Sequence, residues 1–138
     1  MTPEQRFEAL AAADGAALEA LADRILASGV RVSVDSGPES VSAPVRISMP
    51  GEAPNTVVLG HIALTRCSVL VDATRGDGMR SGCDFPGAVA AAVCDAETER
   101  GGALSAEVIE LCTVTLRAAA DRRRERGDLV AMTRLGEP

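Results

Sequence analysis

The chain has 138 residues, 46% of them hydrophobic and 25% charged, which suits one globular domain and excludes a disordered tail. Its formal net charge is −6, and it contains two Phe, no Tyr and no Trp. An acidic chain with so few aromatic rings lacks both the positive surface and the stacking platforms of a nucleic-acid-binding protein.

Residues 3–28 are predicted to form two helices or one kinked helix. Thr2 can cap the first turn, Pro3 suits the first helical position, and Gln5 can complete a capping box with Thr2. A break is predicted at Asp14-Gly15. Apolar residues then recur at helical spacing until Gly29, at Leu18, Leu21, Ile25 and Leu26.

Three extended runs follow, at 30–34, 45–49 and 56–72, and apolar and polar residues alternate in the first two. A loop around Pro38 is expected between the first two runs, and a turn containing Pro50-Gly51 and Pro54-Asn55 between the last two. Gly60 marks a bulge or a break in the third run. Successive runs joined by turns predict an antiparallel meander.

A glycine-rich stretch, GDGMRSGCD (76–84), separates the last run from an alanine-rich segment. It can be a structural connection, or an anion-binding nest assisted by Arg75 and Arg80. Its glycine spacing fits neither the P-loop nor the dinucleotide fingerprint, and Asp77 and Asp84 offset the positive charge. We therefore favour a strand-to-helix connection in which Asp84 caps the next helix.

Two more helices are expected, over 85–98 and from Ser105 to about Arg126, where Gly127 would end the second. Residues 128–135 alternate and are predicted to be a last short strand or an extended arm. The element order predicts a single α+β domain over 1–138, with a mainly antiparallel sheet and helices packed on one side. The predicted buried stripe of the last helix is Val108, Leu111, Cys112, Thr115 and Ala119.

Few residues suggest chemistry of their own. The four cysteines (67, 83, 94 and 112) lack C-x-x-C spacing and lie away from the single His61, so no metal site is predicted. Cys94 and Cys112 are expected to be buried thiols. The arginines within 122–126 either complement the end of the helix dipole or form a salt-bridge surface for an acidic partner. The carboxylates expected to be solvated are Asp95, Glu97, Glu99 and Glu107.

No signal peptide begins the chain, and no apolar stretch reaches the roughly 20 residues that a membrane-spanning helix needs. These absences, together with four cysteines that show no C-x-x-C spacing, predict a reduced, cytoplasmic protein.

Three stretches, taken in order, resemble one known family. They are GHIALTRCSV (60–69), GDGMRSGCDFPGAVAAAVCDA (76–96) and AAADRRRERGDLVAMTR (118–134). Together with Arg6 and the apolar residues after it, they resemble the PhnG family, the G subunit of the bacterial carbon–phosphorus lyase system. The chain differs in having Cys83 in place of an Arg, and Leu129 and Val130 in place of aromatic residues. The matching positions are Thr65, Arg66, Gly76, Gly82, Asp84, Ala88, Asp95, Ala96, Asp128, Met132 and Arg134.

The resemblance implies a subunit of a core complex that contains H, I and J subunits and that an L subunit joins transiently. Such proteins support the attachment of a phosphonate to ribose C1 of ATP with loss of adenine, which gives ribose 1-phosphonate 5-triphosphate. ATP is then a substrate of the complex, and no cofactor is expected on this chain alone. The groups that displace adenine are generally sought on the I subunit, so the chain is expected to be an accessory subunit of a transferase.

The sequence leaves two alternatives to this expectation: a homo-oligomeric structural protein, and a stand-alone enzyme acting on an anionic metabolite through Arg66, Arg75, Arg80 and Asp84. Candidate substrate-binding residues are Arg66, Arg80 and Asp84. Candidate partner-interface residues are Leu129, Val130, Met132 and Arg134.

Overall fold

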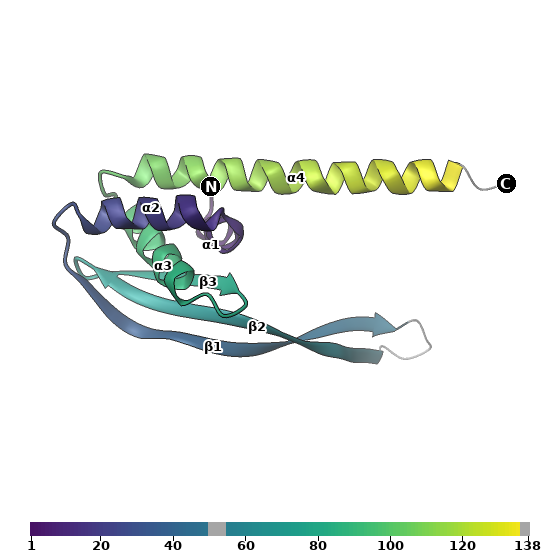
Figure 1. Ribbon diagram of the computed structural model, residues 1–138, viewed down its shortest axis with the longest axis horizontal. Helices are drawn as coiled ribbons and strands as arrows, with labels where there is room; N and C mark the ends of the chain where they lie inside the picture. Colours follow the sequence, from purple (N-terminus) through teal and green to yellow (C-terminus); the bar gives the residue numbers. More distant parts are fainter. Residues whose placement is uncertain (50–54, 136–138) are drawn as a thin grey trace.

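A computed structural model describes residues 1–49 and 55–135, so the turn predicted around Pro50-Gly51 and Pro54 lies outside the described residues. These residues form a three-stranded antiparallel sheet in the order β1-β2-β3, with four helices on one side of it (Figure 1). The predicted α+β class is confirmed. The elements are α1 (Pro3–Ala12), α2 (Gly15–Leu26), β1 (Val32–Met49), β2 (Asn55–Val71), β3 (Thr74–Ser81), α3 (Phe85–Glu99) and α4 (Ser105–Leu135).

The first two helices follow their local signals. The Thr2 hydroxyl accepts a hydrogen bond from the Gln5 backbone N–H, and the Gln5 side chain accepts one from Thr2, so the capping box is present. Asp14 caps α2 by accepting from Ala17 N at 3.0 Å. The predicted break at Asp14-Gly15 is therefore confirmed.

The strands are longer than predicted. The loop expected around Pro38 is wrong, because β1 runs through it with register shifts between Val34 and Glu39. β1 is an edge strand, where a proline costs no ladder hydrogen bond if its nitrogen faces outwards. The bulge expected near Gly60 is confirmed: Val45 pairs with Gly60 and Arg46 with Val58, which leaves Leu59 unpaired.

The glycine-rich stretch is mainly a strand, so its interpretation as a connection is wrong for Gly76 to Ser81. These residues belong to β3, which pairs with β2 from Thr74 to Ser81. A Cβ atom on Gly76 would lie 2.1 Å from the Ala92 carbonyl oxygen, and one on Gly78 would lie 2.4 Å from Ala92 N. The glycines therefore let α3 approach the sheet closely. Only the last residues connect β3 to α3, and Asp84 caps that helix as predicted, accepting from Gly87 N at 3.0 Å.

The end of the chain is also helical. α4 continues through Gly127 to Leu135, so the predicted strand or arm over 128–135 is wrong. An exposed glycine costs a helix only about 1 kcal/mol, which is too little to stop it. Because the helix runs on, the arginines within 122–126 are not in its last turn, and the helix-dipole explanation for them fails as well.

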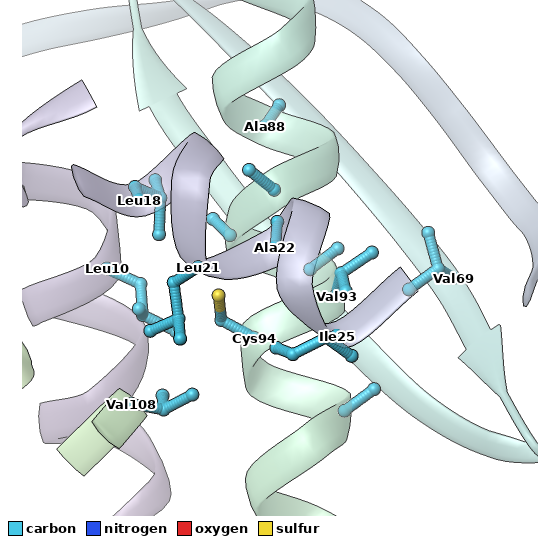
Figure 2. Close-up of a cluster of buried hydrophobic side chains, with 14 of the residues drawn as sticks. Leu10, Leu18, Leu21, Ala22, Ile25, Val69, Ala88, Val93, Cys94 and Val108 are labelled. Atoms are coloured by element: carbon cyan, nitrogen blue, oxygen red, sulfur yellow. The ribbon is translucent and has the colours of Figure 1, made fainter. Parts of the chain in front are cut away.

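The core is built around α3, which is buried on nearly all sides. Side chains from α1 and α2, including Leu10, Leu18 and Ile25, point towards it, and Val69 of β2 and Val108 of α4 complete the cluster (Figure 2). The predicted stripe of α4 packs here, with Val108 and Cys112 fully buried. Among the described residues no helix has both the length and the apolar composition to cross a bilayer.

Candidate functional site

The candidate substrate-binding arginines lie on different faces of the sheet. Arg66 pairs across the ladder with Met79, whereas Arg80 pairs with Thr65, so their side chains point in opposite directions. Arg66 is exposed and forms an ion pair with Glu39 of β1 at 2.8 Å. One small ligand therefore cannot contact both arginines from a single face.

Arg80 and Asp84 hold helices in place. The Arg80 Nη1 donates to the carbonyl oxygens of Leu10, Ala11 and Ala13 at 3.1, 3.1 and 2.7 Å, which satisfies the end of α1. Its Nε donates to Asp84 Oδ2 at 3.2 Å, while the other carboxylate oxygen caps α3. Both side chains thus have structural partners in this arrangement.

A buried ion cluster that the sequence interpretation missed joins α1 to α3. Arg6 Nε donates to Asp95 Oδ1 at 2.6 Å, and Arg6 Nη2 donates to Glu99. The side chains of Arg6 and Asp95 are only 6% and 10% exposed. Burial alone would lower the pKa of Arg6, but the hydrogen bonds and charges of Asp95 and Glu99 outweigh it and raise that pKa.

The same cluster protects the free edge of the sheet. The Asp95 Oδ2 accepts a hydrogen bond from the backbone N–H of Asp77 in β3 at 2.9 Å. β3 has β2 on one side only, so this amide faces outwards from the ladder. Asp95 therefore satisfies Arg6 and an edge amide at once.

The expectation of solvated carboxylates is wrong for Asp95 and Glu97. Glu97 is fully buried and forms an ion pair with Arg100 at 2.6 Å. Glu99 and Glu107 are partly exposed, as expected. One signal for the cluster was present in the sequence: Arg6 shares the helical stripe of Ala9, Leu10 and Ala13, and an arginine there requires a buried acid.

Two neighbouring clefts border this region. A cleft of about 530 Å³ is lined by Arg6, Asp95 and Glu99 together with α1 residues, and a second of about 590 Å³ contains Arg66 and Ser68. Phe7, Arg75 and Asp77 line both. Arg75 is already shared among Asp35, Asp77 and Ser68. Most of the charged side chains that line the two clefts form ion pairs within the chain.

The other chemistry-bearing residues lie apart. His61 is exposed on β2, and within residues 1–49 and 55–135 no three His, Cys, Asp or Glu side chains come together as a metal site requires. The candidate interface residues Leu129, Val130 and Met132 are each more than half exposed, and Arg134 belongs to the last turn of the same helix.

The cysteines differ in their expected reactivity. Burial raises the pKa of Cys94 to about 12 and that of Cys112 to about 11, and it also raises the pKa of Cys67. Because the thiolate is the reactive form, an alkylating reagent at about pH 8 is expected to label exposed Cys83 alone in the native chain. Mass spectrometry before and after urea unfolding checks this, with Cys83→Ser as the unlabelled control. Native labelling of Cys94 at the rate of Cys83 would contradict the closed core.

A comparison with protein families matches residues 2–135 to the family described as phosphonate metabolism protein PhnG. The matched region includes every described helix and strand. A comparison with curated proteins gives no significant match. The family match spans nearly the whole chain, so the chain belongs to the PhnG family and has its role in phosphonate metabolism, as a subunit of a complex that serves it.

Proposed function

We propose that this chain is a subunit of the carbon–phosphorus lyase core complex, in the cytoplasm, and that it supports formation of ribose 1-phosphonate 5-triphosphate from ATP and a phosphonate. The family match over residues 2–135 carries this proposal. Its partners are the I, H and J subunits, with the L subunit joining transiently, and ATP is a substrate of the assembly.

The chain acts as an accessory subunit that is not catalytic alone. Two observations support this role. Several ionisable groups that line its clefts are engaged in ion pairs that join its own elements, such as Arg6 of α1 with Asp95 of α3 and Arg75 of β3 with Asp35 of β1. Its candidate substrate ligands Arg66 and Arg80 point to opposite faces of the sheet, which disfavours a stand-alone enzyme that uses both.

The proposed contact with partners uses Leu129, Val130, Met132 and Arg134. These residues lie on a helix, so strand pairing with a partner edge is no longer an option for them. A helix can instead lay side chains into a groove of another protein. Exposed apolar residues at the end of a long helix suit that mode.

Reconstitution tests the proposal. The purified chain with ATP and methylphosphonate is expected to release no adenine above background, because its candidate ligands Arg66 and Arg80 lie on opposite faces of the sheet. The chain combined with the I, H and L subunits is expected to release adenine, and omission of the chain is expected to abolish most of that activity. Chromatographic detection of adenine provides the measurement.

The control is the same mixture without the I subunit. Adenine release by the chain alone at an enzymatic rate would contradict its accessory role. Failure of the chain to co-purify with I and H subunits from the same host at micromolar concentration would contradict its membership of the complex.

A further inference from the structure

Two arms of the molecule project past the packed body in the same direction (Figure 1). One, the helical arm, is residues 121–135 of α4. The other, the hairpin arm, is residues 40–49 of β1 and residues 55–64 of β2, in which Val41 pairs with Leu64 and Met49 with Asn55. The helices that pack against α4 are α1, α2 and α3, all within the body. Every residue of the helical arm from 121 to 132 is exposed.

The buried stripe of α4 continues along the helical arm as arginine. Val108, Cys112, Thr115 and Ala119 follow three- and four-residue steps, and the next such positions are Arg122, Arg123 and Arg126. None of these three arginines forms an ion pair or hydrogen bond with a described residue, and Arg122 borders a cavity of about 300 Å³ near Asp14 without pairing to it. The face that packs the core therefore becomes an unpaired cationic face outside it.

The carboxylates of the helical arm lie off this stripe. Asp121 pairs with Arg124, and both lie on the opposite side of the helix from Ala119 and Arg126. The chain has no lysine, so its 14 basic side chains other than histidine are all arginine, and it is acidic overall at −6. The three unpaired arginines form a positively charged patch on a protein whose net charge is negative. Arginine is also the basic residue enriched at protein interfaces.

The hairpin arm has the same character. Residues 40–49 and 55–64 contain no Asp or Glu, and their ionisable side chains are Arg46 and His61, both exposed. One face of this arm is apolar, since Val41 pairs with Leu64, Ala43 with Ile62 and Ile47 with Val57. Arg46 pairs with Val58 and therefore lies on the other face, which is the face that buried Thr65 presents to the helices, since Ser40 pairs with Thr65.

We propose that the two arms together dock an acidic segment of a partner protein. Arg122, Arg123 and Arg126 would pair with its carboxylates, and the hairpin arm would supply Arg46. A nucleic acid fits less well, because the arms have no aromatic ring for base stacking and the whole chain is acidic. That the partner is a subunit of the complex rests on the proposed function. That the docked segment is acidic rests on the arginines alone.

Charge reversal on the stripe tests the proposal. The stripe variant is Arg122→Glu with Arg126→Glu. The matched control is Arg117→Glu with Arg124→Glu, which changes the net charge equally on the opposite side of α4. All four positions are exposed, so both variants are expected to keep the wild-type unfolding midpoint. The probe is a fluorescent synthetic peptide of alternating glutamate and leucine, with ATP and duplex DNA as competitors.

The stripe variant is expected to bind the peptide at least about tenfold more weakly than wild type and control, and added salt is expected to remove most of that difference. In co-expression with the I, H and J subunits, the stripe variant is expected to be depleted from the purified complex and the control retained.

A stripe variant that matches the control in both assays overturns the proposal, as does preferential displacement of the peptide by ATP or DNA. If wild type and both variants assemble equally, the docking proposal fails and the proposed function stands. If wild type does not assemble but the peptide result holds, the proposed function fails and the docking proposal stands.

Discussion

Replacement of Gly76 by alanine is expected to be among the most destabilising single changes in this protein. A Cβ atom there would lie 2.1 Å from Ala92 O, 2.5 Å from Ala96 N and 2.6 Å from Ala96 Cβ, whereas ordinary contact begins at 3.4 Å. Two of these neighbours are backbone atoms of α3 and cannot rotate away. The helix must therefore move off the sheet by roughly 1 Å, and close-packed interiors resist such a shift.

The expected loss is about 3 kcal/mol or more of unfolding free energy, from overpacking and from lost contacts of α3 with β2 and β3. That is a large part of the roughly 5–15 kcal/mol available to a domain. Gly78→Ala should behave similarly, because its Cβ would meet Ala92 N and Ala88 O at 2.4 and 2.5 Å. Urea unfolding followed by circular dichroism gives the free energies.

Gly60→Ala is the matched control, because a Cβ there meets nothing within 4 Å and the residue also lies in a strand. It is expected to change stability by no more than about 0.5 kcal/mol. Equal stability of the Gly76 and Gly60 variants would contradict the close packing of α3 against β3.

The glycines also explain one limit of sequence interpretation. Glycine between an apolar run and a helix is typical of a turn, because glycine adopts backbone conformations that other residues rarely adopt. The property used here is the absence of a side chain where α3 approaches, and that depends on a partner element some 15 residues away in sequence. Local caps were predictable for the opposite reason: Thr2 with Gln5, and Asp84 with Gly87, act within a single turn.

The end of α4 shows a different limit. Periodicity identifies an element by the face that it buries, and residues 121–132 bury no face within this chain. Their short alternation of apolar and polar residues is therefore easily confused with that of a strand. The continuation of the helical stripe from Ala119 to Arg122 and Arg126 was the better signal, although arginine at those positions does not suggest burial.

The candidate site was predicted only in part. Arg80 and Asp84 do come together, but the contacts of Arg80 with the end of α1 depend on residues about 70 positions away. The partner of Arg6 is 89 positions away, so no spacing rule could identify it. What the sequence could indicate was the need for a partner, because Arg6 interrupts an apolar stripe.

Removal of the Arg6 charge is the second change for which a large effect is expected. Arg6→Met keeps much of the side-chain length but leaves Asp95, which is 10% exposed, without its cation. Breaking one side of a buried pair typically costs about 3–5 kcal/mol, because the remaining charge stays desolvated. The exposed pair of Arg24 and Glu107 is the control, and Arg24→Met is expected to cost about 1 kcal/mol or less.

Two further measurements separate loss of charge pairing from loss of packing in Arg6→Met. Protonation of the stranded carboxyl removes its charge, so the deficit relative to wild type is expected to shrink as the pH falls from about 7 towards 5. Addition of Asp95→Asn should likewise recover part of the deficit, since an amide is cheaper to leave unpaired than a carboxylate and still accepts the hydrogen bond from Asp77 N. A deficit that is independent of pH and unchanged by Asp95→Asn would contradict the ion-pair account. It would mean that the Arg6 side chain holds α1 in place by packing, and that α1 stabilises the edge of β3 by packing and not by charge.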